Sequence, residues 1–407
     1  MPVHYQEPSQ LLPVAGVKLG VAEAAIKKPG RKDLLVIALA EGSQVAGVFT
    51  QNAFAAAPVQ VCRERLAAGG AAIRALLVNS GNANAATGQG GVDDARATAA
   101  AVAAALGLAP EAVLPFSTGV IGQRLPVLRM VAAAPAAVAA LSEDGWLAAM
   151  RAIMTTDTVG KGASRTARTT QGLVTVTGIA KGVGMIHPNM ATMLAYIATD
   201  ARLTAEATQA LIRQAANKTF NCVTVDGDTS TNDACMLMAT GKVGTAEVDS
   251  RHPDYPAIAE AVTAVCMELA HAIVRDGEGA TKFIRVQVGS AACEAEARAV
   301  ALSIAHSPLV KTAMFASDAN WGRIAMAIGK AGVEGLDVGG VTIALDDVPV
   351  IAGGQPHPDY REALGSAVLA KEEFSIRVGL GRGASEATVW TCDFSYDYVK
   401  INAEYRT

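Results

Sequence analysis

One segment of the chain combines residue types that could carry chemistry with a break in regular structure. It runs from Lys181 to Asp200 and reads KGVGMIHPNMATMLAYIATD. Its first half is rich in glycine and contains Pro188, whereas the half that begins at Thr192 is strongly apolar. A threonine hydroxyl at such a junction is a candidate nucleophile. The simpler alternative is a loop that enters a buried strand, with the Thr192 hydroxyl bonded to its own backbone.

Familiar cofactor and metal motifs are absent from the sequence. Residues 178–184 lack the spacing of a phosphate-binding P-loop, and Gly241-Lys242 is followed by valine rather than by serine or threonine. The nearest match to a dinucleotide fingerprint, GLGRG at 379–383, lacks the third glycine. The 6 histidines form no HExxH pair and the 6 cysteines form no CxxC pair. We therefore expect no bound metal or organic cofactor, and we interpret the cysteines as small buried thiols.

A second polar segment, DGDTSTND, occupies residues 226–233. Its first positions resemble a calcium loop, but position six is Thr231 rather than glycine and position twelve is Leu237 rather than glutamate. These two differences exclude an EF-hand. Two interpretations stay open: a polar turn whose side chains cap backbone groups, or a loop that lines a site.

Six motifs follow one another along the chain, and their order is more informative than any one of them. Together they resemble the ornithine acetyltransferase family of arginine biosynthesis, the self-cleaving glutamate N-acetyltransferases. The resemblance extends from the neighbourhood of residue 10 to residue 407, and its most specific part is PNMATML at 188–194. Ala86 and Ala319 depart from the family pattern, where cysteine and proline are expected, but neither position is assigned chemistry. The motifs are residues 79–88, 117–122, 181–200, 227–233, 276–282 and 401–407.

The resemblance implies that the chain cuts itself between Ala191 and Thr192. The Thr192 hydroxyl would attack the Ala191 carbonyl, and water would hydrolyse the resulting ester. An α-chain of residues 1–191 and a β-chain of residues 192–407 would result, sharing one compact fold plus a smaller C-terminal lobe. The α-amine released on Thr192, with a reference pKa of about 7.7–8.0, could then serve as general base for the adjacent hydroxyl. In a ping-pong reaction, N-acetylornithine would acetylate Thr192 and glutamate would collect the acetyl group.

The resemblance also implies which residues form the site. The Thr118 hydroxyl and the Gly119 N–H would stabilise the tetrahedral oxyanion, and one such donor typically contributes about 10²–10³ in rate. Without the resemblance, this pair would be an ordinary strand-to-turn corner. The expected substrate-binding residues are Thr155, Lys181, Thr192, Glu278, Asn402 and Thr407.

Charge suggests roles for two of these residues. The compact cation of Lys181 suits an α-carboxylate, and Glu278, in a glycine-rich turn after a predicted helix, could meet the ornithine ammonium. A glutamate acceptor fits poorly beside Glu278, and the sequence offers no explanation for this conflict. The alternatives are a solvated loop charge for Lys181, a surface residue at a helix end for Glu278, and a turn cap in a polar tail after a strand for Asn402.

Composition limits the class of protein. The chain has 407 residues, 34 basic and 38 acidic, and thus a net charge of −4. Apolar residues make up 51% and aromatic residues only 4%, which excludes intrinsic disorder and predicts two or three lobes at this length. The acidic balance argues against a nucleic-acid binder. The N-terminus lacks the pattern of a signal peptide and the apolar run at 34–40 is too short to span a bilayer, so we expect a cytoplasmic protein.

Hydrophobic periodicity alternates between strand and helix along the chain. This alternation predicts an α/β (α+β) fold of layered mixed sheets covered by helices, and the resemblance specifies an αββα-type architecture. The expected strands are 34–39, 75–78, 172–179, 192–198, 282–288, 341–345, 375–379 and 387–393. The expected helices are 92–106, 204–217, 256–275, 294–305 and 323–331.

Several questions stay open at the level of sequence. Acetyl-CoA is a possible second acetyl donor, and the resemblance suggests α/β heterodimers that pair into an α2β2 heterotetramer. Two other functions compete with acetyl transfer: an amide hydrolase with an N-terminal nucleophile, in which water replaces glutamate, and a non-catalytic binding protein, which would remain one polypeptide.

Overall fold

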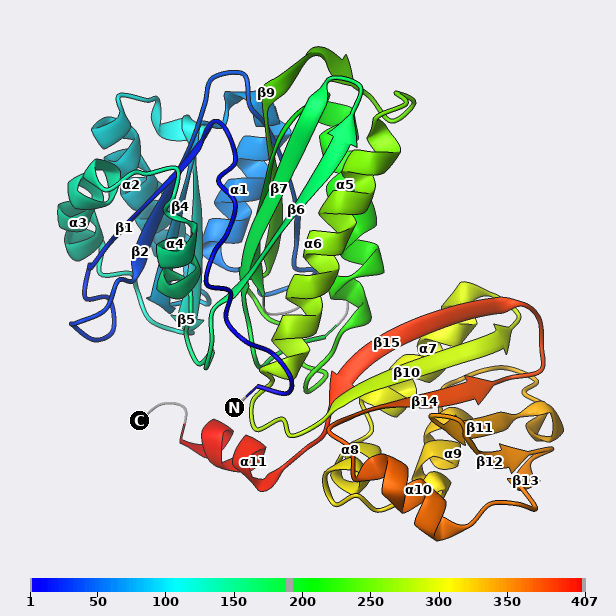
Figure 1. Cartoon of the computed structure of the whole chain (residues 1–407). Helices are drawn as coiled ribbons and strands as arrows, with labels where there is room; N and C mark the ends of the chain where they lie inside the picture. The colour runs from blue at the N-terminus through cyan, green and yellow to red at the C-terminus, as the bar shows by residue number, and fades with distance from the viewer. Residues whose placement is uncertain (1, 188–192, 405–407) are drawn as a thin grey trace. The chain divides into compact units, whose positions relative to one another are not determined.

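The computed structural model describes residues 2–187 and 193–404, and the chain folds into two units (Figure 1). The large unit comprises residues 6–221 and 228–273. The small unit comprises residues 1–5, 222–227 and 274–407.

The first sheet of the large unit has four strands in the order β1-β2-β4-β5. Strands β1, β2 and β4 pair antiparallel, whereas β4 and β5 run parallel, so the carboxyl ends of β4 and β5 lie at the same edge. The strands are β1 (Val17–Ala22), β2 (Leu34–Leu39), β4 (Ala75–Asn82) and β5 (Val113–Val120).

The second sheet has five strands in the order β3-β9-β8-β7-β6. Strand β7 ends at Lys181 and its antiparallel neighbour β8 begins at Leu194, and these two residues are paired. The 191–192 bond therefore lies in the connection between two adjacent strands of one sheet. The strands are β3 (Gln44–Phe49), β9 (Ala234–Val248), β8 (Leu194–Leu203), β7 (Gly172–Lys181) and β6 (Lys161–Thr169).

The two sheets pack face to face over a shared apolar core. In β2, Leu35 and Ile37 face this core, whereas Leu34 and Val36 belong to the cluster on the other face of the sheet. This alternation follows from the two-residue period of a strand, and it makes β2 buried on both sides. Phe116 of β5 contacts Tyr196 of β8 edge to face, with ring centroids 5.3 Å apart, and so joins the two sheets.

Helices cover both outer faces. Helices α2 (Gly88–Leu106) and α3 (Val127–Ala139) supply alanine and valine side chains to the cluster beneath the first sheet. Helices α5 (Ala205–Lys218) and α6 (Tyr255–Arg275) lie along the second sheet (Figure 1). Gly178 of β7 allows α6 to approach closely, because a Cβ there would meet Val265 at 2.8 Å.

The large unit is thus an αββα sandwich, and the predicted fold class is confirmed. Its remaining helices are α1 (Ala57–Ala67), α4 (Trp146–Ala152) and the single 3-10 turns Gly70–Ala72 and Pro110–Ala112. Among the described residues, one helix, α6, has the length and apolar composition of a membrane span. More than half of that apolar window, 56%, is buried within the protein, as in a core helix.

The small unit is built on a six-stranded sheet in the order β13-β12-β11-β14-β10-β15, in which β10 and β14 are parallel. Its strands are β10 (Phe283–Ala291), β11 (Thr342–Leu345), β12 (Val348–Ala352), β13 (Gln355–Pro356), β14 (Glu373–Gly379) and β15 (Ser385–Cys392). Its helices are α7 (Glu294–Ala305), α8 (Pro308–Phe315), α9 (Trp321–Gly329), α10 (Glu362–Leu369) and α11 (Tyr396–Ala403), with a 3-10 turn at Val338–Gly340. A further 3-10 turn, Phe220–Cys222, lies where the chain passes from one unit to the other.

Most predicted elements are present, and three differences matter. The chain end is the helix α11 rather than a polar tail after a strand, so Asn402 lies in a helix. The 15-residue strand β9 was not predicted, because its second half (TGKVGTAEV) loses the continuous apolar pattern of the first. Cys293 is exposed, whereas the other five cysteines are buried thiols as expected.

Candidate active site

Thr118 and Gly119 lie near the end of β5, where its pairing with β4 is irregular. Gly81 pairs with Gly119, whereas Asn82 pairs with residues on both sides of it. Gly119 has φ +137°, and a Cβ there would lie 2.3 Å from the Gly81 carbonyl carbon. Only glycine fits this position, because both the backbone angle and the space exclude a side chain. The irregular register interrupts the ladder beside Thr118, as bulges near active sites do.

Asparagine side chains hold this strand end in place. The Asn232 amide donates to the Ser117 carbonyl at 2.8 Å and to the Ala83 carbonyl at 2.6 Å. The Ser117 hydroxyl donates to Asn79 Oδ1 at 2.6 Å, and the Asn79 amide donates to the Asn82 carbonyl. Of the two interpretations of residues 226–233, the structure supports the polar turn for Asn232, whose amide satisfies backbone carbonyls of the neighbouring sheet.

Lys181 is the last residue of β7, and its side chain reaches the oxyanion pair. It is only 4% exposed, so the interpretation as a solvated loop charge is wrong. Its Nζ donates to Thr118 Oγ1 at 3.3 Å. Because the Thr118 oxygen accepts this bond, its own hydrogen is available to donate to another group.

A buried ion pair lies beside Lys181. Asp157 and Lys161 are both fully buried, and Lys161 Nζ donates to Asp157 Oδ1 at 2.7 Å. The same carboxylate accepts the backbone N–H of Thr155 at 3.0 Å and that of Gly182 at 2.7 Å. Asp157 thus ties the predicted substrate residue Thr155 to the end of β7.

Electrostatics keep the Asp157 carboxyl ionised. Burial by itself would raise its pKa, but the charges of Lys161 and Lys181 and the hydrogen bonds from Lys161 and Thr155 lower the pKa well below its usual range. Neither Asp157 nor Lys161 was singled out from the sequence. Their spacing of four residues, in a polar stretch before a strand, was the only available signal.

Glu278 and Asn402, both in the small unit, are brought together by a glycine. Asn402 Nδ2 of α11 donates to Glu278 Oε2 at 2.9 Å. Gly279 has φ +69°, and a Cβ there would lie 2.5 Å from the Tyr398 nitrogen, so only glycine lets the turn pack on α11. Glu278 is 8% exposed and is therefore not the surface residue of the simpler interpretation.

Three predicted residues, Ala191, Thr192 and Thr407, lie outside the described residues. Their neighbour Met193 is described, and its N–H donates to Asp233 Oδ1 at 3.0 Å. Asp233 is the last residue of the motif at 227–233, and its residue type alone indicates no role. Among the described residues, no group of three or more His, Cys, Asp or Glu side chains could hold a metal ion.

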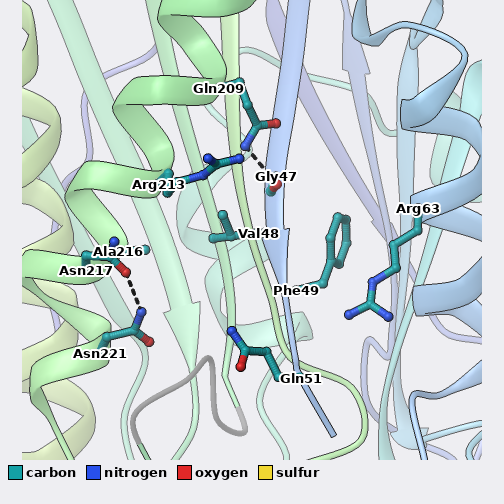
Figure 2. Close-up of a pocket in the computed structure, with 10 residues that line it drawn as sticks. All are labelled: Gly47, Val48, Phe49, Gln51, Arg63, Gln209, Arg213, Ala216, Asn217 and Asn221. Carbon is teal, nitrogen blue, oxygen red and sulfur yellow. Dashed lines mark hydrogen bonds between the residues drawn. The ribbon is translucent and has the colours of Figure 1, made fainter. Parts of the chain in front are cut away.

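A cavity of about 410 Å³ lies elsewhere in the large unit, between α5 and the Arg63 side chain of α1 (Figure 2). Strand β3 forms its floor, and none of the predicted site residues lines it. Gln209 donates to the Gly47 carbonyl at its upper end, whereas Arg213 has no ion pair among the described residues (Figure 2). Arg213 therefore offers a cation whose removal leaves the Thr118–Lys181 contact untouched.

The contacts above define a layered αββα protein with a buried hydroxyl and lysine at adjoining strand ends. The ArgJ family model matches residues 18–407, and the chain belongs to this family. It is 58% identical over 398 residues to the arginine biosynthesis bifunctional protein ArgJ of Methylococcus capsulatus, covering 98% of this chain and 97% of that protein. Membership makes it an acyltransferase of arginine biosynthesis.

Two solved structures are also similar to this chain. The arginine biosynthesis bifunctional protein ArgJ of Bacillus halodurans is 41% identical to this chain, with a TM-score of 0.48. The match covers 50% of this chain and 95% of the Bacillus chain. The ornithine acetyltransferase of Mycobacterium tuberculosis, solved in complex with ornithine, is 37% identical to this chain, with a TM-score of 0.38. The match covers 43% of this chain and 92% of the Mycobacterium chain.

Proposed function

We propose that this chain is a glutamate N-acetyltransferase that moves an acetyl group from N-acetylornithine to glutamate. The acetyl group is carried on Thr192, after the chain has cut itself between Ala191 and Thr192. The observation that carries the proposal is the contact of Lys181 with Thr118 beside Gly119, at the end of the strand that leads to residues 188–192. Family membership supports the same reaction class.

The cut is an exchange of an amide for an ester. Thr192 Oγ adds to the Ala191 carbonyl carbon, the carbon–nitrogen bond breaks, and the nitrogen takes up a proton to become the α-amine. Water then hydrolyses the ester, which restores the hydroxyl and leaves a carboxylate on Ala191. The free amine accepts the proton of its own hydroxyl in the next reaction, since a threonine hydroxyl alone is a weak nucleophile.

Acetyl transfer uses the same hydroxyl twice. Thr192 Oγ attacks the acetyl carbonyl of N-acetylornithine, and ornithine leaves as the amine. Glutamate then attacks the acetyl-threonine ester through its own amine and regenerates the hydroxyl. Each half-reaction passes through an oxyanion, and in this proposal Thr118 and Gly119 donate hydrogen bonds to it. The Lys181 ammonium supports this role, because it binds the oxygen side of the Thr118 hydroxyl.

Charge divides the proposed substrate-binding residues into two groups. Thr155 and Lys181 serve the α-carboxylate, since an ammonium carries three donors and can bind Thr118 and substrate together. Glu278, held by Asn402, serves the ornithine ammonium, and Thr407 completes the set.

The assembly, donor and location belong to the same proposal. We propose that the α- and β-chains form an α2β2 heterotetramer in the cytoplasm, without metal or bound organic cofactor. The Methylococcus relative is named bifunctional. For this chain we propose acetyl-CoA as a second acetyl donor, which an assay with acetyl-CoA and glutamate tests directly.

Two measurements test the proposed function. Ornithine release from N-acetylornithine is expected to require added glutamate, whereas equal release without glutamate would establish the alternative hydrolase. Amino-terminal sequencing of the fragments should read Thr-Met-Leu-Ala-Tyr beside the original terminus. A single intact polypeptide without transfer activity would favour a non-catalytic protein.

Thr118→Ala is expected to lower kcat about 10²–10³-fold, with a much smaller change in KM, because the lost donor acts on charge that develops in the transition state. Steady-state kinetics of the cleaved enzyme measure this. Thr98→Ala is the matched control, since Thr98 is also a buried threonine of this unit but donates only within its own helix. Arg213→Ala controls for loss of a cation. A Thr118→Ala enzyme with full kcat would remove Thr118 from the mechanism.

A further inference from the structure

The hairpin loop between β1 and β2 carries a group of cations beside the oxyanion pair. Residues 27–32 read KKPGRK, so four of the six are basic, and all six are exposed. A Cβ on Gly81 would lie 3.1 Å from the Lys27 Cβ, so the loop packs directly on this residue of β4. Gly81 is in turn paired with Gly119 of β5. The loop therefore lies next to the strand end that provides the proposed oxyanion donors.

Carboxylates hold this loop in one conformation. Asp33 is only 2% exposed, and its two oxygens accept the N–H groups of Ala24 and Ile26, both at 2.6 Å. Glu23 Oε1 accepts the N–H of Gly30 at 2.7 Å, and this glycine has φ +86°. A loop that is fixed in this way loses little conformational freedom when a ligand binds to it.

Arg31 is the cation of this loop that extends to the predicted substrate residues. Its Nη2 donates to the Met154 carbonyl at 2.6 Å and to Ser80 Oγ at 3.4 Å. Met154 immediately precedes Thr155, one of the predicted substrate-binding residues. Ser80 is paired with Thr118 across the parallel strands β4 and β5. Arg31 thus links the segment before Thr155 to the strand beside Thr118.

Two cations contact neighbouring residues on one face of the first sheet. Ser80 and Thr118 point to the same side, because paired residues of adjacent strands share a face, and such strands are about 4.8 Å apart. Arg31 contacts Ser80, and Lys181 contacts Thr118. The four carbon–carbon bonds between the two carboxylate carbons of glutamate span about 5 Å, which is close to this spacing. A small dicarboxylate can therefore meet both cations.

Arg31 also retains donors for a ligand. A guanidinium carries five N–H donors, and both contacts of Arg31 use Nη2 alone. Its Nε and Nη1 have no partner among the described residues, and no carboxylate of that part of the chain forms an ion pair with it. A carboxylate is a strong partner for these donors, because hydrogen bonds between ions are shorter and stronger than neutral ones.

We propose that Arg31 is a specificity-determining residue that binds the side-chain carboxylate of the acceptor glutamate. N-acetylornithine and glutamate share an α-carboxylate, which the proposed function assigns to Thr155 and Lys181. Only glutamate carries a second carboxylate, whose charge is opposite to that of the ornithine ammonium, and Arg31 gives it a positive partner. This inference rests on the proposed function, because glutamate is an acceptor only in that reaction.

A ping-pong reaction allows each half to be measured separately. The first turnover, in which one ornithine per enzyme leaves N-acetylornithine, involves no glutamate, so its rate in Arg31→Gln is expected to equal that of the wild type. For the second half, kcat/KM for glutamate is expected to fall about 10–100-fold, the usual effect of losing a hydrogen bond between charged groups. Arg31→Lys keeps the charge and should recover part of this loss.

Glutamine as acceptor separates carboxylate binding from a general weakening of the site. It has the shape of glutamate but a neutral amide in place of the side-chain carboxylate. Its kcat/KM should change little in Arg31→Gln, so the preference for glutamate over glutamine should fall by the same 10–100-fold. An Arg31 that only holds the Met154 carbonyl would weaken both acceptors equally, and that result would overturn the proposal.

Arg129→Gln is the matched control. Arg129 is another exposed arginine that binds the same loop, because its Nη1 donates to the Ala25 carbonyl at 2.9 Å. The substitution removes a positive charge and a contact with the loop, but it leaves the contacts of Arg31 with Met154 and Ser80 intact. We expect wild-type rates for both halves of the reaction.

The outcomes distinguish this inference from the proposed function. A wild type that releases no ornithine in the first turnover contradicts the proposed function itself. A wild type that completes both halves, together with an Arg31→Gln enzyme of unchanged preference for glutamate, overturns only the role of Arg31. An Arg31→Gln chain that stays uncut beside a fully cut Arg129→Gln chain also overturns that role, since Arg31 would then serve self-cleavage.

Discussion

Thr192→Ala is expected to remain a single chain of 407 residues and to lose acetyl transfer to the limit of detection. Without a hydroxyl there is no nucleophile for the Ala191 carbonyl, no released α-amine and no acetyl carrier, so one substitution removes both reactions. A denaturing gel reports the cleavage, because the wild type should give fragments of 191 and 216 residues. Ornithine release in the presence of glutamate reports the transfer.

Two control variants make this result specific. Thr192→Ser keeps a hydroxyl and should still cleave and transfer, at an altered rate. Thr199→Ala removes a buried threonine hydroxyl of β8 that accepts the Ala201 N–H, and this variant should cleave normally. If Thr192→Ala still splits at the same bond, or if the intact protein transfers acetyl groups at the wild-type rate, the proposed mechanism is wrong.

Asp157→Asn is expected to reduce the free energy of unfolding by about 3–5 kcal/mol, the usual cost of removing one partner of a buried ion pair. The substitution removes the carboxylate that pairs with the fully buried Lys161 ammonium. It also weakens the hydrogen bonds that the Thr155 and Gly182 N–H groups donate to this side chain. Because Gly182 follows Lys181, acetyl transfer should fall as well. Denaturant midpoints of the large-unit transition measure the stability.

The double variant Asp157→Asn/Lys161→Met sharpens this test. It removes both charges, so it should recover much of the stability lost in Asp157→Asn. Glu64→Gln, which breaks the exposed pair of Arg96 and Glu64, should cost no more than about 1 kcal/mol. Equal losses for the buried and the exposed pair would contradict the role given to Asp157.

The ion pair also has a pH signature. The pKa of Asp157 is lower in the folded protein than in the unfolded chain, so its contribution to stability is present above the unfolded pKa of about 3.9. That contribution is lost as pH falls below about 4, because the unfolded chain then binds the proton more readily. Acid unfolding of Asp157→Asn/Lys161→Met should accordingly depend less on pH in this range.

Local patterns predicted much of the fold. Strand β2 and helix α7 have the predicted bounds, 34–39 and 294–305, because their apolar spacing is decided by a few neighbouring residues. Strand β9 escaped prediction, since its second half is held by pairing with β8 rather than by its own composition. Helix α11 was not predicted for a similar reason, because its residue Asn402 forms a hydrogen bond with Glu278, which lies far away in the sequence.

The sequence by itself determined the family, through the order of its motifs, and it named Thr118, Lys181 and Glu278 as candidates. Tertiary structure alone decided their environments: a buried lysine on a threonine hydroxyl, a glutamate held by Asn402, and two aspartates, Asp157 and Asp233, that sequence reasoning left without roles. The physical reason is that hydrogen bonds and buried charges join residues far apart in the chain. Lys181 and Thr118 are 63 residues apart, and no local pattern encodes such a contact.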